Sequence, residues 1–338
     1  MIIARSPLRI SFAGGGTDLP VFYEKYGWGA VVSTSINCYV YVTLNKKFDG
    51  KVSVRYSIHE NCDQVIELKH ALIRETLLNY GVTNGIEIVI VSEVPARGSG
   101  LGASSALTSA LCLCLAEYQG KVDNDKESIA EGASYIEIER VGSPIGKQDH
   151  YSSALGGLNF FRFTKRKVEI KSFPRTDFVE ELEGQSMLFS LNMEREYKDG
   201  SFVHKILREQ MDSIDSMNQI YQMQRDNALR LWEHMQYEVI ERFMDHVNEN
   251  WRLKRKTHPE ITNPAIDSII QRALSAGATA AKVCGAGGGG FLYLMVPPSM
   301  QGNVRSQLEE LHELRFRFDT KGAEVIFSDM ENYAYADR

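Results

Sequence analysis

The sequence has few cysteines and no apolar run long enough to cross a membrane. Its cysteines stand at positions 38, 62, 112, 114 and 284, and no two of them form a Cys-x-x-Cys pair. An odd number without that spacing argues against a disulfide framework or a zinc site, and favours reduced thiols in a cytoplasmic protein. No stretch of about 18 apolar residues occurs, so we expect no membrane span. The first residues do not have the apolar length of a signal peptide.

The sequence also lacks an excess of positive charge. Its 38 lysines and arginines are outnumbered by 44 aspartates and glutamates, which gives a net charge of −6. Such a chain does not attract nucleic acid or anionic membranes, so neither is an expected partner. None of the eight histidines stands in a His-x-x-x-His pair, the usual spacing of a zinc helix. A length of 338 residues is enough for two domains with a substantial core.

Two standard nucleotide-binding motifs are missing as well. No Gly-x4-Gly-Lys-Ser/Thr string occurs, which excludes a Walker P-loop. The Gly-x-Gly-x-x-Gly spacing does occur, at Gly285, Gly287 and Gly290. It leads into the strand-like run Phe291–Val296, whereas a dinucleotide-binding fold needs a helix at that point. We therefore reject the Rossmann interpretation.

A third kind of glycine-rich segment is present at residues 95–106. It reads Pro95-Ala-Arg-Gly-Ser-Gly-Leu-Gly-Ala-Ser-Ser-Ala106 and joins a predicted strand at 85–94 to a predicted buried helix at 103–118. Glycine lets backbone N–H groups approach a ligand, and a helix N-terminus adds unpaired donors and positive potential. The segment is therefore a candidate phosphate site, with a flexible surface loop as the alternative. Hydroxyls at Ser104 and Ser105 can serve phosphate or Mg²⁺.

The rest of the chain alternates predicted helices and strands, which indicates an α+β fold. Strands are predicted at 1–12, 28–44, 51–58, 85–94, 156–173 (as a pair), 185–191, 278–284, 290–296 and 322–328. Helices are predicted at 64–80, 103–118, 125–140, much of 201–255, 264–276 and 299–314. The acidic stretch 177–183 suggests a junction between two domains, residues 1–178 and 179–338.

Two further segments place charged residues beside glycine turns. The first contains Arg9 and Asp18 on either side of a triple-glycine turn, and a strand turn is its simpler interpretation. The second contains Glu137 at the end of a predicted helix and Asp149 after two more glycines. One such acid can accept a proton from an attacking hydroxyl, and another can hold Mg²⁺ through oxygen. Surface acids on a helix are the alternative interpretation of this pair.

These segments together resemble the three motifs of the GHMP kinases, the family of galactokinase, homoserine kinase and mevalonate kinase. Residues 6–18 resemble the first motif, 95–106 the second and 282–290 the third, in the same order. A tight hairpin is the alternative for 282–290, although hairpins rarely need five glycines in six residues. The strings Gly14-Gly-Gly-Thr-Asp18 and Gly146-Lys-Gln-Asp149 are similar to the sugar 1-kinase branch, which includes heptose 7-phosphate kinases and fucokinase-like enzymes.

The resemblance implies a fold and an activity. The fold would have an N-terminal ribosomal-protein-like domain with a left-handed βαβ unit and a C-terminal ferredoxin-like domain. The activity would be phosphorylation of the anomeric hydroxyl of a manno-heptose 7-phosphate, with ATP and Mg²⁺ as cofactors. Alternatives are a 1-kinase for an unphosphorylated sugar such as fucose or galactose, and a non-catalytic sensor of sugar and nucleotide. The expected partners are a sugar phosphate and ATP, for a monomer or homodimer.

The resemblance also implies roles for single residues. Asp149 would be the catalytic base that faces the anomeric hydroxyl, and Arg9 would lie beside it and keep it ionised. Magnesium would lie near Ser104, Ser105 and Glu137, with Glu139 as the alternative to Glu137. The ATP phosphates would be bound by Arg97, Gly98, Ser99, Gly100, Leu101, Gly102, Ala103, Ser104 and Ser105. The sugar would be bound by Gly15, Gly16, Thr17, Asp18, Gly287 and Gly288. Candidates for binding a second phosphate on the sugar are Lys147, Arg195, Lys198 and Lys205.

Overall fold

Two β-sheets organise the chain in the computed structural model, which describes residues 1–95, 98–121, 125–191 and 201–329. Within these residues the larger sheet has nine strands along the path β13-β1-β2-β5-β3-β4, with β6 and β12 on β2 and β7 on β6. Its strands are β1 (Ile2–Ala13), β2 (Gly29–Lys46), β3 (Val52–Arg55), β4 (His59–Cys62), β5 (Ile86–Ser92), β6 (Leu158–Phe163), β7 (Val168–Phe173), β12 (Phe318–Asp319) and β13 (Glu324–Ser328).

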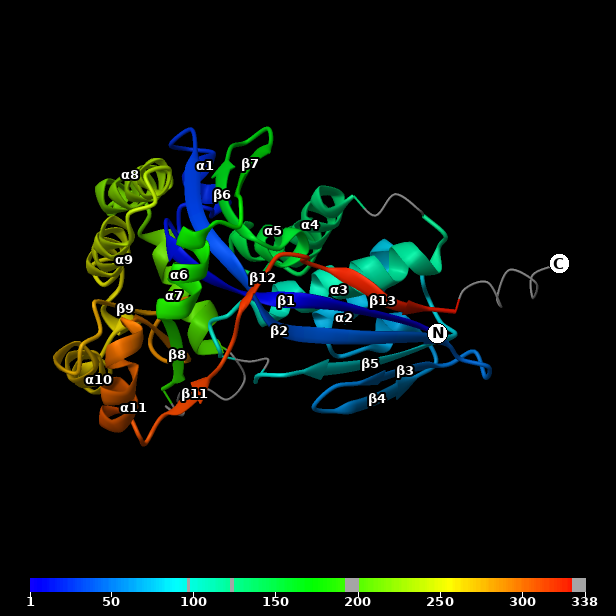
Figure 1. The fold of residues 1–338 in the computed structure, drawn as a ribbon. Coiled ribbons are helices and arrows are strands. Elements are labelled where there is room, and N and C mark those ends of the chain that lie inside the picture. The colour runs from blue at the N-terminus through cyan, green and yellow to red at the C-terminus, as the bar shows by residue number, and fades with distance from the viewer. Residues whose placement is uncertain (96–97, 122–124, 192–200, 330–338) are drawn as a thin grey trace.

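Strands β1 and β2 form the long antiparallel pair at the centre of this sheet (Figure 1). Their pairing is irregular at two points, between Pro7 and Leu8 and between Ser11 and Ala13. Irregularities of this kind bend a strand and re-aim its side chains, often beside a functional site. They flank Arg9, whose backbone N–H donates instead to the carbonyl of Leu101 at 2.9 Å. The strand is therefore tied directly to the glycine-rich segment.

Helices cover one face of the larger sheet, and α3 (Ala103–Tyr118) is the central one (Figure 1). It is buried over most of its length, as its apolar sequence predicts, and it packs on β1 and β2. Around it lie α2 (Ala71–Asn79), α4 (Lys126–Tyr135) and α5 (Gln148–Leu155). Shorter turns are α1 (Pro20–Tyr23), the 3₁₀ turn η1 (Val65–Glu67) and the π-helical turn η2 (Ile136–Arg140). Strands β3 and β5 are parallel, with α2 between them in the chain.

The smaller sheet contains β8 (Ser186–Ser190), β9 (Ala280–Val283), β10 (Phe291–Met295) and β11 (His312–Leu314). All pairs in it are antiparallel, and the order is β11-β8-β10-β9. Numbered along the chain this is 4-1-3-2, with helices before the second strand and between the third and fourth. This β-α-β-β-α-β arrangement is the ferredoxin-like one that the resemblance implies. The α+β content and the two-domain fold are confirmed.

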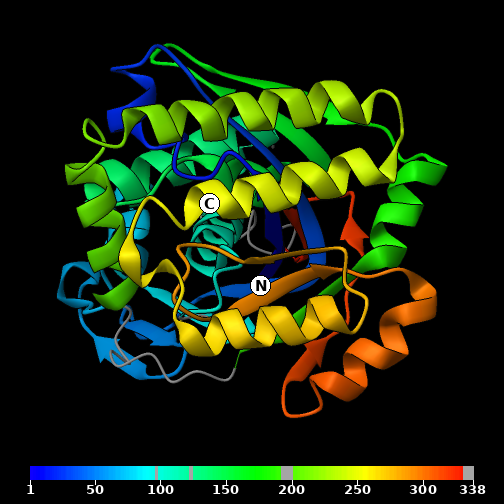
Figure 2. The ribbon, with the colours of Figure 1, turned by 90° about the vertical axis from the view of Figure 1, so that its left-hand side faces the viewer.

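The helices of the second half gather on one side of the molecule. Figure 2 shows α8 (Asn218–Met235) and α9 (Ile240–Lys254) running side by side across that face. Both also contact β1 of the larger sheet. The others are α6 (Asp177–Gln185), α7 (Ser201–Asp212), α10 (Pro264–Ser275), α11 (Gln301–Gln307) and the 3₁₀ turns η3 (Pro259–Ile261) and η4 (Pro298–Met300). No helix in the described ranges combines the length and apolar character of a membrane span.

Several predicted elements differ from the structure. The predicted helix 64–80 begins only at residue 71, because Glu60 accepts the backbone N–H groups of Lys69 and His70 and holds the chain open there. The predicted helix 299–314 ends at residue 307, since residues 312–314 add to β8 as an edge strand.

The acidic stretch 177–183, predicted to mark a junction between domains, lies in helix α6. After β11 the chain returns to the larger sheet through β12 and β13. The boundary at residue 178 stays a prediction.

Candidate active site

A cavity of about 500 Å³ brings together residues from both halves of the chain. Its walls include segment 98–104, the triple-glycine turn, the start of α5 and residues from α7, α8 and α9. Of the predicted site residues, those that line it are Arg9, Gly15, Gly16, Asp18, Gly98, Ser99, Gly100, Gly102, Ala103, Ser104, Glu137 and Asp149. The predicted site residues of three segments that are far apart in sequence, 9–18, 98–104 and 137–149, therefore meet at one cavity.

The two glycine-rich loops pack backbone against backbone at this cavity. A Cβ atom on Gly100 would lie 2.6 Å from the carbonyl oxygen of Cys284, and one on Gly285 would lie 2.5 Å from the Cα of Gly100. A Cβ on Gly290 would lie 2.5 Å from the carbonyl oxygen of Ser99. All three glycines have positive φ, a second reason for their identity. The glycines are thus required by the contact between the loops, and not only by a ligand.

Among the described residues, five predicted site residues do not line the cavity: Thr17, Leu101, Ser105, Gly287 and Gly288. Thr17 is fully buried, and its hydroxyl bonds to the carbonyls of Gly14 (2.8 Å) and Ala30 (2.9 Å). A side chain at Gly287 or Gly288 would meet Ile261 or Phe202, respectively. The contact of these two glycines with the sugar stays a prediction, and Gly285 and Ala286 of the same loop do line the cavity. Leu101 is also buried, and Arg97 lies outside the described residues.

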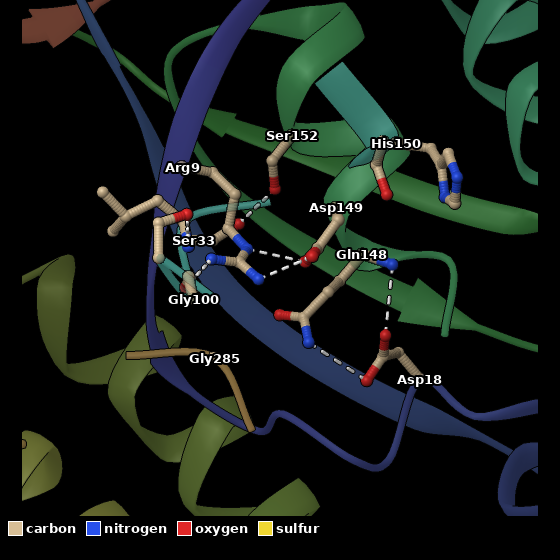
Figure 3. Close-up of polar contacts among 12 residues, drawn as sticks. Arg9, Asp18, Ser33, Gly100, Gln148, Asp149, His150, Ser152 and Gly285 are labelled. Carbon is tan, nitrogen blue, oxygen red and sulfur yellow. Dashed lines mark hydrogen bonds and ion pairs between the residues drawn. The ribbon is translucent and has the colours of Figure 1, made fainter. Parts of the chain in front are cut away.

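Arg9 and Asp149 form a bidentate ion pair on the cavity wall (Figure 3). Nε of Arg9 donates to Oδ1 of Asp149 and Nη2 donates to Oδ2, both at 2.6 Å. Nη1 of Arg9 donates to the carbonyl of Gly100 at 2.7 Å. Arg9 is 4% exposed, whereas 21% of the Asp149 side chain remains accessible. Asp149 can therefore reach a ligand while Arg9 fixes its orientation.

Gly102 lets this pair approach the start of helix α3. Its φ is +80°, and a Cβ there would lie 3.2 Å from Cγ of Arg9 and 3.3 Å from Oδ2 of Asp149. The helix begins one residue later, so its unpaired N–H groups lie beside the ion pair. A helix N-terminus next to a positively charged guanidinium favours binding of an anion.

Asp18 lies against the beginning of helix α5 (Figure 3). Its Oδ2 accepts the backbone N–H of Gln148 at 3.2 Å, and its Oδ1 accepts the side-chain amide of Gln148 at 3.3 Å and the N–H of Gly16 at 3.0 Å. Burial, with a smaller contribution from the negative charge of Asp149, raises the pKa of Asp18 from 3.8 to about 6. The carboxylate is thus held in place by backbone donors at a cost in solvation.

Glu137 lies in the π-helical turn, a feature often associated with functional sites. Its Oε2 accepts the hydroxyl of Ser105 at 3.2 Å and is 2.8 Å from Nε2 of His150. Glu137 is 3% exposed and lines the cavity, whereas Glu139 is exposed. Geometry therefore favours Glu137 over Glu139 as the acid near segment 98–105.

The candidate magnesium ligands are the oxygens of Glu137, Ser104 and Ser105, and oxygen is the ligand atom that Mg²⁺ prefers. Ser104 is exposed on the cavity wall, and Ser105 is buried against Glu137. No cluster of three or more His, Cys, Asp or Glu that could hold a metal occurs within the described ranges. One carboxylate and a hydroxyl fit a magnesium ion whose remaining ligands are phosphate oxygens and water.

Two lysines at the cavity were not predicted as site residues. Lys282, which belongs to the third motif, is 3% exposed and donates to the carbonyls of Ser11 and Phe12. Lys254, at the end of α9, donates to the carbonyl of Gly285. Burial lowers the pKa of Lys282 to about 7 and that of Lys254 to about 8. Lys254 stands in no motif, so the sequence held no signal for it.

Two of the four candidate cations for a second phosphate, Lys147 and Lys205, form ion pairs with carboxylates. Lys147 pairs with Glu131 at 2.6 Å, and Lys205 pairs with Glu260 at 3.2 Å. Neither is among the residues that line the cavity. The other two candidates, Arg195 and Lys198, fall outside the described residues.

The two ends of the cavity differ in character. Apolar side chains from the β2, β5, α2 and α3 side include Val40, Leu72, Ile90 and Leu107. Polar side chains from α7, α8 and α9 and the turn after α9 include Gln210, Gln224, Asn250 and Thr257. Two buried acceptors at the cavity, Oε1 of Gln148 and Oε1 of Gln224, have no hydrogen-bond partner in the described part of the chain. Unpaired buried acceptors are costly, and a ligand rich in hydroxyl groups would satisfy them.

Comparison with known families and proteins gives a consistent result. The model of the GHMP kinases N terminal domain matches residues 64–157, and that of the GHMP kinases C terminal domain matches residues 235–313. D-glycero-alpha-D-manno-heptose 7-phosphate kinase of Campylobacter jejuni is 30% identical over 95% of this chain and 97% of its own length. The L-fucokinase/L-fucose-1-P guanylyltransferase of Bacteroides fragilis is 26% identical over 90% of this chain, which spans 35% of that protein.

Solved structures share the fold. A D-glycero-D-manno-heptose 1-phosphate kinase from Bacteroides thetaiotaomicron matches with a TM-score of 0.76 at 22% identity, covering 97% of this chain and 100% of that one. A putative sugar kinase from Campylobacter jejuni matches with a TM-score of 0.70 at 24% identity, covering 96% of this chain and 97% of that one.

Proposed function

The chain belongs to the GHMP kinase family, and from this premise we propose that it transfers the γ-phosphoryl group of ATP to the anomeric hydroxyl of a manno-heptose 7-phosphate. The observation on which the proposal rests is the ion pair of Arg9 and Asp149 beside the start of α3, in one cavity with Asp18. A phosphate site, an oriented carboxylate and a polar pocket are the parts that phosphoryl transfer to an alcohol requires.

ATP is assigned to the apolar end of the cavity and to segment 98–105. The apolar side chains there suit a nucleotide base, and the backbone N–H groups at the start of α3 suit its phosphates. Glu137, with Ser104 or Ser105, would hold Mg²⁺ together with phosphate oxygens. When bound, the ion neutralises charge on the transferred group.

The sugar is assigned to the polar end. Asp18 accepts hydrogen bonds from hydroxyl groups, and Gly15 and Gly16 leave room for the ring. The unpaired oxygens of Gln148 and Gln224 accept further hydroxyls. A buried pocket of acceptors selects for donors in its ligand, because a ligand without them leaves these oxygens unpaired.

In the reaction, the anomeric oxygen forms a bond to the γ-phosphorus while the bond from that phosphorus to the β,γ-bridging oxygen breaks. The electron pair of the broken bond leaves with ADP, and the hydroxyl proton passes to Asp149. Arg9 fixes the orientation of Asp149 through two hydrogen bonds and adds positive charge near the transferred group. Asp149 orients the hydroxyl and accepts its proton.

The choice of a heptose 7-phosphate is supported by the relative of that name, which matches over nearly the full length of both chains. A 1-kinase for an unphosphorylated sugar is the second candidate, because Lys147 and Lys205 are already paired with carboxylates. A non-catalytic sensor is disfavoured, since it has no need of an oriented base. A cytoplasmic location and a role in making activated heptose for surface polysaccharide belong to the same proposal, and oligomeric state stays a prediction.

ADP release tests the function. The purified protein is mixed with ATP, Mg²⁺ and a panel of sugars with and without a terminal phosphate. ADP formed with manno-heptose 7-phosphate supports the proposal, ADP formed with free sugars alone favours the second candidate, and no ADP with any sugar favours the sensor.

A further inference from the structure

Lys254 lines the cavity and carries a positive charge, and it belongs to none of the three motifs. It is the last residue of α9, and it is half-buried. Its Nζ donates to the carbonyl of Gly285, the residue whose backbone packs on Gly100. The carbonyl of Gly100 in turn accepts from Arg9. Lys254 is therefore connected through two backbone groups to the ion pair of Arg9 and Asp149.

The neighbouring cations, Arg9 and Lys282, make more hydrogen bonds than Lys254. Arg9 donates to both oxygens of Asp149 and to the carbonyl of Gly100. Lys282 is buried with its ammonium group on two carbonyls of β1. Lys254 donates to a single neutral carbonyl, that of Gly285, and no carboxylate hydrogen-bonds to it within the described ranges. An ammonium group has three donors, which leaves two for a ligand.

We propose that Lys254 contacts the phosphoryl group as it moves from ATP to the sugar, and remains on the C1 phosphate of the product. The inference rests on the proposed function and adds a catalytic residue from the second half of the chain. This placement follows from the two glycine loops: Lys254 donates to Gly285 of one loop, and Gly285 packs on Gly100 of the other loop, just before the start of α3. A fixed cation there stabilises the negative charge on the three oxygens of the phosphoryl group during its transfer.

The titration of Lys254 gives a readout that packing alone would not. Its pKa of about 8 results chiefly from burial, which lowers it, with Arg9 lowering it further and Cys284, Asp149 and Asp18 raising it. Lys282 is a further positive neighbour. If the charged form is needed, kcat should fall as pH rises above about 8. Arginine stays charged throughout this range, so Lys254→Arg should remove that alkaline limb.

The experiment compares Lys254→Met, Lys254→Arg and the control Lys256→Met, which removes an exposed lysine two residues away. ADP is measured directly by chromatography across a pH series, with ATP and manno-heptose 7-phosphate varied in turn. We expect kcat of Lys254→Met to fall about 100-fold with KM values little changed, as for loss of one charge-stabilising donor. Lys254→Arg should retain much of the activity without the alkaline limb, and Lys256→Met should match the wild type.

Each other outcome overturns the inference. An unchanged kcat in Lys254→Met, or persistence in Lys254→Arg of the alkaline limb centred near pH 8, would show that Lys254 does not serve the transferred group. A loss confined to KM for the sugar phosphate would place Lys254 on the acceptor's own phosphate instead. If Lys254→Met fails to fold, the pH profile of Lys254→Arg decides. A wild type inactive on every sugar would remove the proposed function and this inference with it, whereas the earlier outcomes leave the function intact.

Discussion

Replacing Asp149 with asparagine separates the role of its charge from the role of its shape. Asparagine keeps one oxygen for Arg9 but loses the second acceptor, so one of the two 2.6 Å hydrogen bonds is lost and Arg9 keeps its charge in a buried position. Loss of a hydrogen bond to a charged group costs about 1.5–3 kcal/mol. We therefore expect a measurable fall in melting temperature without loss of the fold.

The kinetic effect of Asp149→Asn should be larger than a fold defect can explain. Loss of a base or orienting group lowers turnover by about 100-fold or more. That factor corresponds to about 2.7 kcal/mol in the activation free energy. The assay is ADP release at saturating ATP and sugar, with nucleotide binding checked separately by the shift in melting temperature on addition of ADP. Binding of ADP should be retained, because Asp149 is not assigned to the nucleotide.

Glu131→Gln provides the matched control. Glu131 also forms a 2.6 Å ion pair, with Lys147, and accepts from Tyr151 at 2.7 Å, but it is not among the residues that line the cavity. Its loss should lower stability and leave kcat unchanged. Near-full turnover by a folded Asp149→Asn protein would refute the assignment of Asp149 as base or orienting group.

Three further predictions test other parts of the site. The folded state binds the proton of Asp18 more tightly than the unfolded state, so its stabilising effect is complete below about pH 4 and is lost as pH rises through about 6. Above pH 6, Asp18→Asn should therefore raise the free energy of unfolding by up to about 3 kcal/mol, and the melting temperature with it. It should also raise KM for the sugar. An unchanged melting temperature above pH 6 would contradict the cost of the buried charge. Glu137→Gln should weaken activation by Mg²⁺ in a titration, whereas the exposed Glu139→Gln should not, and equal effects would contradict the choice between them. Gln224→Met should raise KM for the sugar and leave KM for ATP unchanged, and an equal rise in both would place Gln224 outside the sugar pocket.

Much of the fold and the proximity of the motif residues could be predicted from the sequence. The strand and the buried helix on either side of the glycine-rich segment are as expected, because strong apolar patterns determine them locally. The expected contact of Arg9 with Asp149, 140 positions apart, is also present. That expectation came from the resemblance to the GHMP kinases, since nothing local to either residue indicates it.

Helix α5 shows why other elements could not be predicted. Residue 147, at its start, gives no side-chain hydrogen bond to cap it, and the helix has only eight residues. Its first N–H group is accepted by Asp18, which is 130 positions away in the chain. A side chain is excluded at Gly146, because a Cβ there would lie 2.0 Å from Oδ2 of Asp18. The cap is therefore formed by tertiary contact, and the local sequence contains no sign of it.

The residues of the second half are hidden for a different reason. Gln224 and Lys254 lie on long amphipathic helices, where a polar residue normally faces solvent. Only the packing of α8 and α9 against the larger sheet turns these positions toward the cavity. Likewise, regular helical spacing cannot choose between Glu137 and Glu139, and the π-helical turn decides it.

The identity of the product is the most direct test of phosphoryl transfer to the anomeric hydroxyl. Manno-heptose 7-phosphate is incubated with ATP, Mg²⁺ and the protein, and the product is examined by phosphorus NMR, with Asp149→Asn in parallel. We predict a heptose 1,7-bisphosphate with one ADP for each phosphate transferred, and almost none from the variant. A phosphate at any hydroxyl other than the anomeric one, or no product from the wild type, would contradict the account.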